Sequence, residues 1–333
     1  MKALALISGG LDSMLAAKIV LEQNIAVEGI NFFIGFAGEN PSCPTTKKHG
    51  AKWVAEKLGI KLHIIDTVEK FKPVLFNPKY GYGKYLNPCL DCKIFMVAQA
   101  KKFMEENKFD FLITGEVLGQ RPKSQRKDTL PLVAKNTDDR LLRPLSAKLL
   151  PLTLPERENW INRELLYGIS GRSRKPQLEL AKKFGWDDFP QPAGGCLLTD
   201  CNFTKRMDDL FTSRNQKNYT LTDIELMKIG RHLRLNKNCK IIVGRNEQEN
   251  NYIEKFKNEY ITLECVNYPG ALILVEGPVN QEEIAFIARV AAYFSKGKNI
   301  AEVEVKIYKK DNKNEIIKVK PLEINELKSI LYV

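Results

Sequence analysis

The sequence has no long apolar run, and no window approaches the roughly 18 uninterrupted apolar residues that a transmembrane helix needs. Its N-terminus also lacks the charged region, apolar stretch and small-residue cleavage site of a secretory signal, and runs directly into the strand-like KALALIS. We therefore expect a cytoplasmic protein with no membrane partner.

Internal repeats, low-complexity linkers and the G-x-x-x-x-G-K-[ST] motif of P-loop ATPases are absent as well. A length of 333 residues predicts two or three domains, and 44% hydrophobic residues are enough for sizeable cores. The net charge of +12 suits a polyanionic partner. The basic excess is densest over residues 120–190, where 15 Lys or Arg stand against 9 Asp or Glu.

Short apolar runs alternate with helical patterns in the first half, which is typical of a parallel α/β sheet. Strands are expected near 2–7, 26–34, 60–65 and 109–114, and helices near 12–23, 45–58, 92–107, 155–167 and 176–184. Pro190 and Gly195 bound an expected loop. Two domains follow from this pattern, at residues 1–200 and 203–333.

The second domain is expected to be a smaller α/β or α+β unit. Thr222 and Glu225 predict a capping box ahead of an amphipathic helix at 225–235. A strand at 239–244, a helix at 246–258, two strands, a helix at 280–295 and two final strands complete the pattern.

Ser8-Gly9-Gly10-Leu11-Asp12-Ser13 follows the first expected strand and opens the first expected helix. Glycines let the backbone approach a phosphate, and the free N–H groups of a helix start can bind it together with the two serine hydroxyls. The Asp12 carboxylate suits Mg²⁺ held between phosphates. This context favours a nucleotide site over a simple capped glycine turn.

SGGLDS resembles the S-G-G-x-D-S signature of the PP-loop ATP pyrophosphatases, which cleave ATP to AMP and pyrophosphate. The resemblance implies a Rossmann-like fold, ATP and Mg²⁺ as cofactors, and adenylation of a substrate oxygen with Asp12 as a catalytic residue. Ligands of such sheets bind at the carboxyl ends of the strands. The residues expected to bind ATP are therefore Ser8, Gly9, Gly10, Asp12, Ser13, Gly115 and Gln120.

A second block, ITGEVLGQRPKSQ at residues 113–125, resembles the T-G-E-x-L-G-Q-x-x-S-Q segment of the tRNA 4-thiouridine synthetases. Arg143-Pro144-Leu145 resembles the R-P-L that follows in that family. The tRNA 2-thiouridylases carry a loop similar to N-P-C-x-x-C, here residues 87–92, and a later cysteine in a setting similar to that of Cys196. Both families thiolate a uridine carbonyl, and the shape of the 113–125 block favours 4-thiouridine formation.

The sequence has seven cysteines, an odd number that argues against a disulfide framework. Cys89, Cys92 and Cys196 have three possible roles: buried small residues, a persulfide relay, or ligands of an iron–sulfur cluster, expected to be 4Fe-4S. The cluster is favoured because a two-cysteine relay has no use for Cys89. Zinc would need a fourth ligand, which Cys201 could supply.

The expected function is thus that of an ATP-dependent tRNA sulfurtransferase with the catalytic residues Asp12, Cys89, Cys92 and Cys196. Its partners are tRNA and either sulfide or a cysteine desulfurase as sulfur donor. A tRNA 2-thiouridylase acting by cysteine persulfide and a non-catalytic RNA-binding quality-control protein are the alternatives.

Typical 4-thiouridine synthetases carry an RNA-binding region ahead of the PP-loop domain, and here we expect the C-terminal domain to take that role. VGRNEQEN at 243–250 and YFSKGK at 293–298 resemble segments of the NFACT-R RNA-binding domain, over about residues 239–321. The side chains expected to contact tRNA are Arg121, Lys123, Arg126, Lys127, Arg172, Arg174, Lys175 and Arg245. His232 is expected on a helix, facing RNA or solvent, while His49 and His63 look structural.

Overall fold

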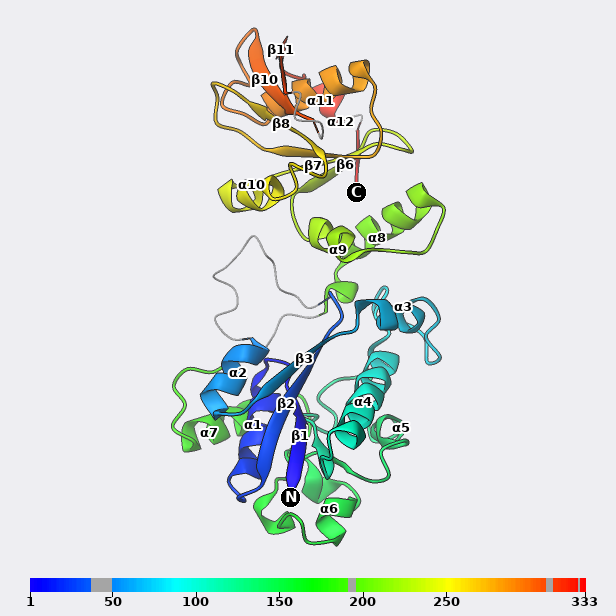
Figure 1. Cartoon of the computed structure of the whole chain (residues 1–333), viewed down its shortest axis with the longest axis vertical. Coiled ribbons are helices and arrows are strands. Elements are labelled where there is room, and N and C mark those ends of the chain that lie inside the picture. The colour runs from blue at the N-terminus through cyan, green and yellow to red at the C-terminus, as the bar shows by residue number, and fades with distance from the viewer. Residues whose placement is uncertain (37–49, 191–195, 310–313, 329) are drawn as a thin grey trace. The chain divides into compact units, whose positions relative to one another are not determined.

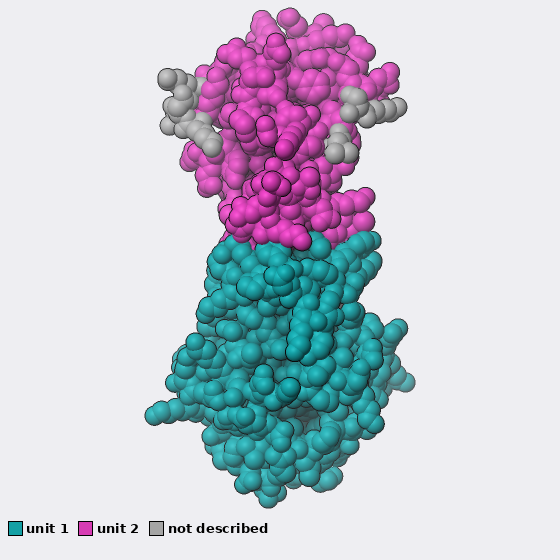
Figure 2. All heavy atoms as spheres, turned by 90° about the vertical axis from the view of Figure 1, so that its right-hand side faces the viewer, with its two compact units in different colours: residues 1–38, 47–199 teal, residues 39–46, 200–333 magenta. Residues whose placement is uncertain are grey.

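The computed structural model describes residues 1–36, 50–190, 196–309, 314–328 and 330–333. The chain divides into two compact units, shown in different colours in Figure 2. Unit 1 comprises residues 1–38 and 47–199, and unit 2 comprises residues 39–46 and 200–333. The start of the helix expected at 45–58, His49 and most of the loop between Pro190 and Gly195 lie outside the described residues. None of the described helices is both long and apolar enough to span a bilayer.

Unit 1 is built on a five-stranded parallel sheet in the order β3-β2-β1-β4-β5. The strands are β1 (Lys2–Leu6), β2 (Ala26–Phe33), β3 (Leu62–Asp66), β4 (Phe111–Ile113) and β5 (Leu141–Leu142). The strand order runs outward from β1 in both directions, so a topological switch point lies between β1 and β4. Open α/β sheets bind ligands at this point, outside the carboxyl ends of the strands.

Helices cover both faces of this sheet (Figure 1). They are α1 (Leu11–Leu21), α2 (Ala51–Leu58), α3 (Val68–Phe76), α4 (Cys89–Glu106), α5 (Leu130–Ala134), α6 (Leu154–Arg157) and α7 (Lys175–Lys183), with 3-10 turns at Ala147–Leu149, Arg163–Leu165 and Leu197–Thr199. Alternate residues of a strand face opposite sides. Ala3 and Ala5 pack in the cluster with α1 and α7, while Leu4 packs in the cluster with α4. The Rossmann-like fold predicted from the sequence is confirmed.

The prediction of a helix at 155–167 is wrong. The structure has only the short α6, followed after a break by the turn Arg163–Leu165. A capping box between Thr153 and Glu156 starts α6, and Asn159 then takes a positive φ of 53° that an α-helix cannot contain. The buried Glu156 carboxylate pairs with Arg163, which holds the chain in this turn.

Unit 2 contains a seven-stranded antiparallel sheet in the order β11-β10-β8-β9-β7-β6-β12. Its strands are β6 (Arg231–Arg234), β7 (Lys240–Val243), β8 (Ile261–Cys265), β9 (Ile273–Glu276), β10 (Val303–Tyr308), β11 (Glu315–Val319) and β12 (Leu331–Tyr332). Its helices are α8 (Cys201–Arg214), α9 (Leu221–Met227), α10 (Glu247–Glu254), α11 (Gln281–Tyr293) and α12 (Ile324–Lys328). Ile287 and Val290 of α11 pack in one core cluster, and Leu226 and Ile253 of α9 and α10 in another. This is an α+β arrangement.

The prediction of an amphipathic helix at 225–235 is also wrong. The capping box joins Thr220 to Asp223, α9 ends at Met227, and residues 231–234 form β6. Gly230 separates the two with φ +69°, and a Cβ there would lie 2.6 Å from Cγ2 of Ile242. The run RHLRL fits a strand period as well as a helical one, and pairing with β7 decides between them.

His232 therefore lies in a strand and is only 1% exposed, which overturns its expected place on an RNA-facing helix. Its Nε2 atom lies 3.0 Å from the carbonyl oxygen of Ile229 and 3.2 Å from that of Leu226. Burial lowers the pKa of His232 well below 6.5, and the charges of Arg206 and Lys240 lower it further. The ring is thus held neutral inside the fold.

This burial predicts a loss of stability in acid. Because the folded pKa of His232 is below its unfolded value, the folded state binds fewer protons, and stability is lost as the pH falls below about 6.5, by at most about 1.4 kcal/mol per pH unit. Urea unfolding of the full chain between pH 7.5 and 5.5 measures this slope. His232→Gln should flatten it, because glutamine does not titrate. An equal slope in both proteins would assign the acid sensitivity to other groups.

Candidate nucleotide and thiol site

Two loops meet at the switch point between β1 and β4. The first, residues 7–10, leads from β1 into α1, and the second follows β4 at residue 114. Gly9 has φ +78°, and a Cβ there would lie 2.9 Å from the backbone nitrogen of Ala51 at the start of α2. At Gly115 a Cβ would lie 2.5 Å from Asp12 C and from Ser13 N. Both glycines therefore permit close backbone contacts around the loop.

Close contact at Gly115 predicts that Gly115→Ala displaces the first turn of α1. Overpacking of this kind typically costs about 1–3 kcal/mol. We expect a lower melting temperature together with weaker nucleotide binding, measured by calorimetry. Gly168→Ala is the control for the melting temperature, because the φ of Gly168 is not left-handed and an added Cβ would be in ordinary van der Waals contact, 3.4 Å from Cβ of Lys148. A Gly115→Ala protein with wild-type stability and nucleotide affinity would contradict the prediction.

The hydroxyl groups of the first loop bond to one another. Ser13 Oγ donates to the carbonyl oxygen of Gly10 at 2.8 Å, and Ser8 Oγ lies 3.3 Å from Ser13 Oγ. Ser8 is exposed, whereas Ser13 is buried. The loop thus holds its own shape and keeps one hydroxyl at the surface.

Asp12 connects this loop to two distant segments of the chain. Its Oδ2 accepts a hydrogen bond from Gln120 Nε2 at 2.6 Å and lies 3.3 Å from Arg174 Nη2. Gln120 Oε1 in turn accepts from Gln177 Nε2 at 2.9 Å. The other oxygen, Asp12 Oδ1, is buried and has no partner among the described residues. A carboxylate oxygen left open in this way can take a cation or a water.

Glu116 and Arg143 form a buried ion pair below the second loop. Arg143 Nε donates to Glu116 Oε2 at 3.0 Å, and the two side chains are 7% and 1% exposed. Arg143 also donates to the carbonyl oxygen of Leu130. The resemblance to the 4-thiouridine synthetases drew attention to both residues, and the structure gives them a common role in holding the loop.

The cysteines of the C-x-x-C pair lie in the first turn of α4. The Cys89 thiol donates to Ser124 Oγ at 3.4 Å. Cys196 belongs to unit 1 as well, and its carbonyl oxygen accepts from Thr199 Oγ1 at 2.6 Å. Cys201, by contrast, opens α8 of unit 2.

The three thiols influence one another's ionisation. Burial raises the pKa of Cys92 to about 12, and Cys196 and Cys89 add to that rise. Burial also raises the pKa of Cys196 to about 11, again with a contribution from Cys89. Arg121 opposes the rise at both sites. These interactions weaken with distance, so the three sulfurs and the Arg121 charge form one neighbourhood.

Three thiols are the donor set of a cluster with one open iron, and in this respect Cys89, Cys92 and Cys196 fit. Within the described ranges, however, no group of three or more His, Cys, Asp or Glu side chains is arranged so that it could hold a metal ion. The three thiols lie in the same region, but their sulfur atoms do not point to a common metal position. Metal binding here would require their side chains to turn toward each other.

Residues 1–142 match the family model of the tRNA methyl transferase HUP domain. Residues 230–331 match that of the NFACT protein RNA binding domain. The chain is therefore similar to a HUP domain over its first part and to an NFACT RNA-binding domain over its last part. The resemblances stated for the two parts of the sequence are thereby confirmed at the level of these domains.

The relatives of the HUP domain include tRNA-thiolating proteins. The tRNA-specific 2-thiouridylase MnmA of Campylobacter curvus is 34% identical over 119 residues, which is 34% of this chain and 34% of that protein. MnmA 1 of Syntrophus aciditrophicus is 25% identical over 189 residues, which is 55% of this chain and 48% of that protein. A solved 4-thiouridine synthetase–RNA complex with bound ATP is 22% identical, covers 55% of this chain and 51% of its own, and has a TM-score of 0.34. The chain spans about a third of the length of the first curated relatives it matches.

The basic side chains of unit 1 that were expected to contact RNA differ in their surroundings. Those of Arg121, Lys123, Arg126, Lys127, Arg172 and Lys175 are exposed. Lys123 Nζ donates to the carbonyl oxygen of Tyr82 at 2.8 Å, and Arg126 pairs with Asp128 at 2.6 Å. Arg174 is set apart, because its guanidinium points to Asp12.

In the region that matches the NFACT model, Arg245 pairs with the buried Glu249 through several contacts, including Nε to Oε1 at 2.9 Å. It also lines a cavity of about 660 Å³ next to Arg231, whose guanidinium lies 5.3 Å from the centre of the Phe294 ring. This cavity joins the two segments that resemble NFACT-R. Glu247 and Glu264 also line the cavity, so the feature that suits a nucleic acid is the Arg231 guanidinium beside the Phe294 ring.

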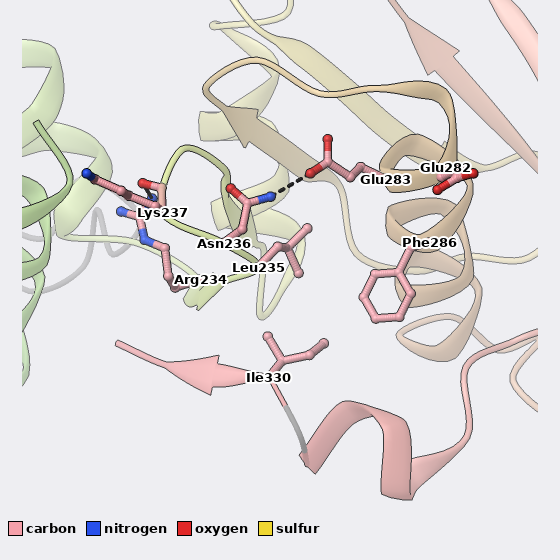
Figure 3. A pocket seen from close by; sticks show the side chains of 8 residues that line it. All are labelled: Arg234, Leu235, Asn236, Lys237, Glu282, Glu283, Phe286 and Ile330. Carbon is pink, nitrogen blue, oxygen red and sulfur yellow. Dashed lines mark hydrogen bonds between the residues drawn. The ribbon is translucent and has the colours of Figure 1, made fainter.

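Unit 2 has a second cavity, of about 690 Å³ (Figure 3). It is lined by Arg234, Leu235, Asn236, Lys237, Glu282, Glu283, Phe286 and Ile330. Asn236 donates to Glu283 at 2.5 Å, and Arg234 is engaged by Asp209 at 2.9 Å. Both cavities are lined by two cationic and two anionic side chains, so charge does not distinguish this cavity from the one beside Phe294.

Proposed function

We propose that the protein is an ATP-dependent tRNA sulfurtransferase that replaces a uridine carbonyl oxygen with sulfur. The observation that carries this proposal is that one short segment, residues 120–124, contacts both the nucleotide loop and the Cys89 thiol. Gln120 donates to Asp12 on the nucleotide loop, and Ser124 four residues later contacts the thiol of Cys89. Nucleotide chemistry and sulfur chemistry therefore adjoin the same short segment.

The reaction has two steps that balance without an external oxidant. The uridine carbonyl oxygen attacks the α-phosphorus of ATP, the bond to the β-phosphate oxygen breaks, pyrophosphate leaves and the uridine N3 proton is released. Hydrosulfide then attacks the adenylated carbon, AMP leaves with the former carbonyl oxygen, and the hydrosulfide proton moves to N3. Asp12 would hold Mg²⁺ against the phosphates, with Ser8, Gly9, Gly10, Ser13, Gly115 and Gln120 around the nucleotide.

We further propose that an iron–sulfur cluster delivers the sulfur. Cys89, Cys92 and Cys196 would hold it, and such a group supplies an open iron that binds hydrosulfide. Sulfide or a cysteine desulfurase would supply the sulfur. A persulfide on Cys92 or Cys196 is the competing route, in which the second cysteine releases the sulfur by forming a disulfide that a cellular thiol must reduce.

The position of the new sulfur separates two candidates. The 113–125 block favours C4 of uridine, and we place 4-thiouridine first. The names of the curated relatives favour C2, because those proteins are 2-thiouridylases. The exposed arginines and lysines of unit 1, together with Arg231 and Arg245, would bind the tRNA phosphates.

A single reaction tests the function. The full chain, prepared anaerobically, is incubated with tRNA, ATP, Mg²⁺ and sulfide, and the digested nucleosides are analysed by mass spectrometry. A tRNA-dependent thionucleoside formed together with AMP is the expected result, and its retention identifies the C4 or C2 isomer. Tight tRNA binding without AMP or thionucleoside would instead support the non-catalytic RNA-binding alternative.

A further inference from the structure

The segment from residue 170 to residue 177 forms a third wall of the nucleotide site. Ser170 makes a parallel bridge with Leu118, and the backbone N–H of Gly171 donates to the carbonyl oxygen of Leu118 at 2.7 Å. Gly119 approaches Gly171 closely, since a Cβ on Gly119 would lie 3.5 Å from its nitrogen. These contacts fix the segment against the loop that follows β4.

Of this segment, Arg174 contacts the nucleotide loop itself, and Gln177 contacts Gln120, which in turn bonds to that loop. Arg174, the N-cap of α7, places Nη2 3.3 Å from Asp12 Oδ2, and its side chain is 27% exposed. Gln177 is fully buried in the first turn of α7 and donates to Gln120 at 2.9 Å. Its own Oε1 is buried and has no hydrogen-bond partner among the described residues. A polar atom left open in this way points to a ligand or water that completes it.

The positive charge of Arg174 compensates for the lack of basic residues in the nucleotide loop. The loop at residues 8–13 contains no lysine or arginine, and its only charged residue is the anionic Asp12. A triphosphate on this loop would meet a negative carboxylate, which is unfavourable unless cations intervene. Among the described residues, Arg174 is the one cationic side chain with a hydrogen bond or ion pair to this loop.

We infer that Arg174 binds the β- and γ-phosphates of Mg²⁺–ATP and that Gln177 positions Gln120 beside them. In the free protein the guanidinium neutralises Asp12. When Mg²⁺ takes the carboxylate, the guanidinium is released to donate to the phosphates, where it stabilises the departing pyrophosphate. Arginine suits this task because its planar fork donates several hydrogen bonds to phosphate oxygens. This assignment replaces the sequence-based expectation that Arg174 contacts RNA, and it rests on the proposed use of ATP.

Binding measurements on the full chain test this role. The probe is α,β-methylene-ATP, which resists cleavage at the reacting bond, titrated with Mg²⁺ by calorimetry. Arg174→Ala should weaken its affinity about 10- to 100-fold, the range for losing hydrogen bonds to a charged group. Arg174→Lys should recover part of the loss, because it restores the charge without the fork. Lys182→Ala, which removes an exposed cation from the same helix, is the matched control and should bind as wild type does.

The results of these measurements distinguish a failure of the Arg174 assignment from a failure of the proposed sulfurtransferase function. The affinity of nucleotide-free protein for tRNA should be equal in wild type and Arg174→Ala. An Arg174→Ala protein that loses tRNA affinity but keeps nucleotide affinity would return Arg174 to RNA binding and overturn the inference. Tighter binding of the Mg²⁺ complex would overturn it too, because Arg174 would then only compete for Asp12. A wild-type protein that binds nucleotide but forms no AMP with tRNA would contradict the proposed function alone.

Discussion

Asp12→Asn is expected to lower AMP formation at least about 100- to 1,000-fold, the loss that removal of one oriented electrostatic group causes in other transfer reactions. Asparagine keeps the size of the side chain and can still accept the hydrogen bond from Gln120 Nε2, which lies 2.6 Å from Asp12 Oδ2. What it removes is the negative charge that would hold Mg²⁺. Affinity for tRNA should stay close to that of wild type, because no phosphate contact of the RNA is changed.

The measurement is tRNA-dependent release of labelled AMP and pyrophosphate at saturating Mg²⁺. Asp110→Asn is a matched control, because Asp110 lies at the opposite end of β4 and accepts from the backbone N–H of Lys2 at 2.7 Å. Asparagine can still accept that bond, so turnover should be retained. Wild-type turnover in Asp12→Asn would remove Asp12 from the chemistry and with it the assignment of the 8–13 loop.

Local patterns explain why the strand, glycine loop and helix around Asp12 could be predicted from the sequence. The strand, the glycines, Asp12 and the helix that follows are contiguous, and each favours the same conformation for its own steric reason. The parallel sheet was likewise predictable from alternating apolar runs. Where two local patterns were equally good, as in the run containing His232, pairing with β7 decided the outcome, and this pairing is not visible in the segment itself.

Contacts between distant segments explain what the sequence could not reveal. Arg174 and Asp12 are 162 residues apart, and Arg174 sits in a basic run that reads equally well as an RNA-binding surface. Gln177 shows no sequence signal at all, because only the packing of α7 buries it. The helix expected at 155–167 failed for a similar reason, since the Glu156–Arg163 pair favours a turn that helical periodicity does not indicate.

Replacement of Cys89, Cys92 or Cys196 by alanine is expected to abolish thiolation. In the cluster route all three thiols are ligands, so each variant should lose iron, labile sulfide, broad visible absorption and product together. Cys239→Ala should keep all four, because Cys239 is buried in the core of unit 2, among residues that bind neither nucleotide nor sulfur in the proposed reaction. Iron and sulfide are measured on anaerobically prepared protein, and thionucleoside by mass spectrometry.

Cys89 decides between the two sulfur routes. A persulfide relay needs one cysteine to carry sulfur and one to release it, and Cys92 with Cys196 would suffice. Cys89→Ala would then keep much of its activity, although the hydrogen bond to Ser124 would be lost. The cluster route instead makes Cys89 as necessary as the other two, because a cubane held by only two thiolates loses a ligand it cannot replace. Full thiolation by an iron-free preparation would refute the cluster, and loss of activity in all three variants together with loss of iron would exclude the two-cysteine relay.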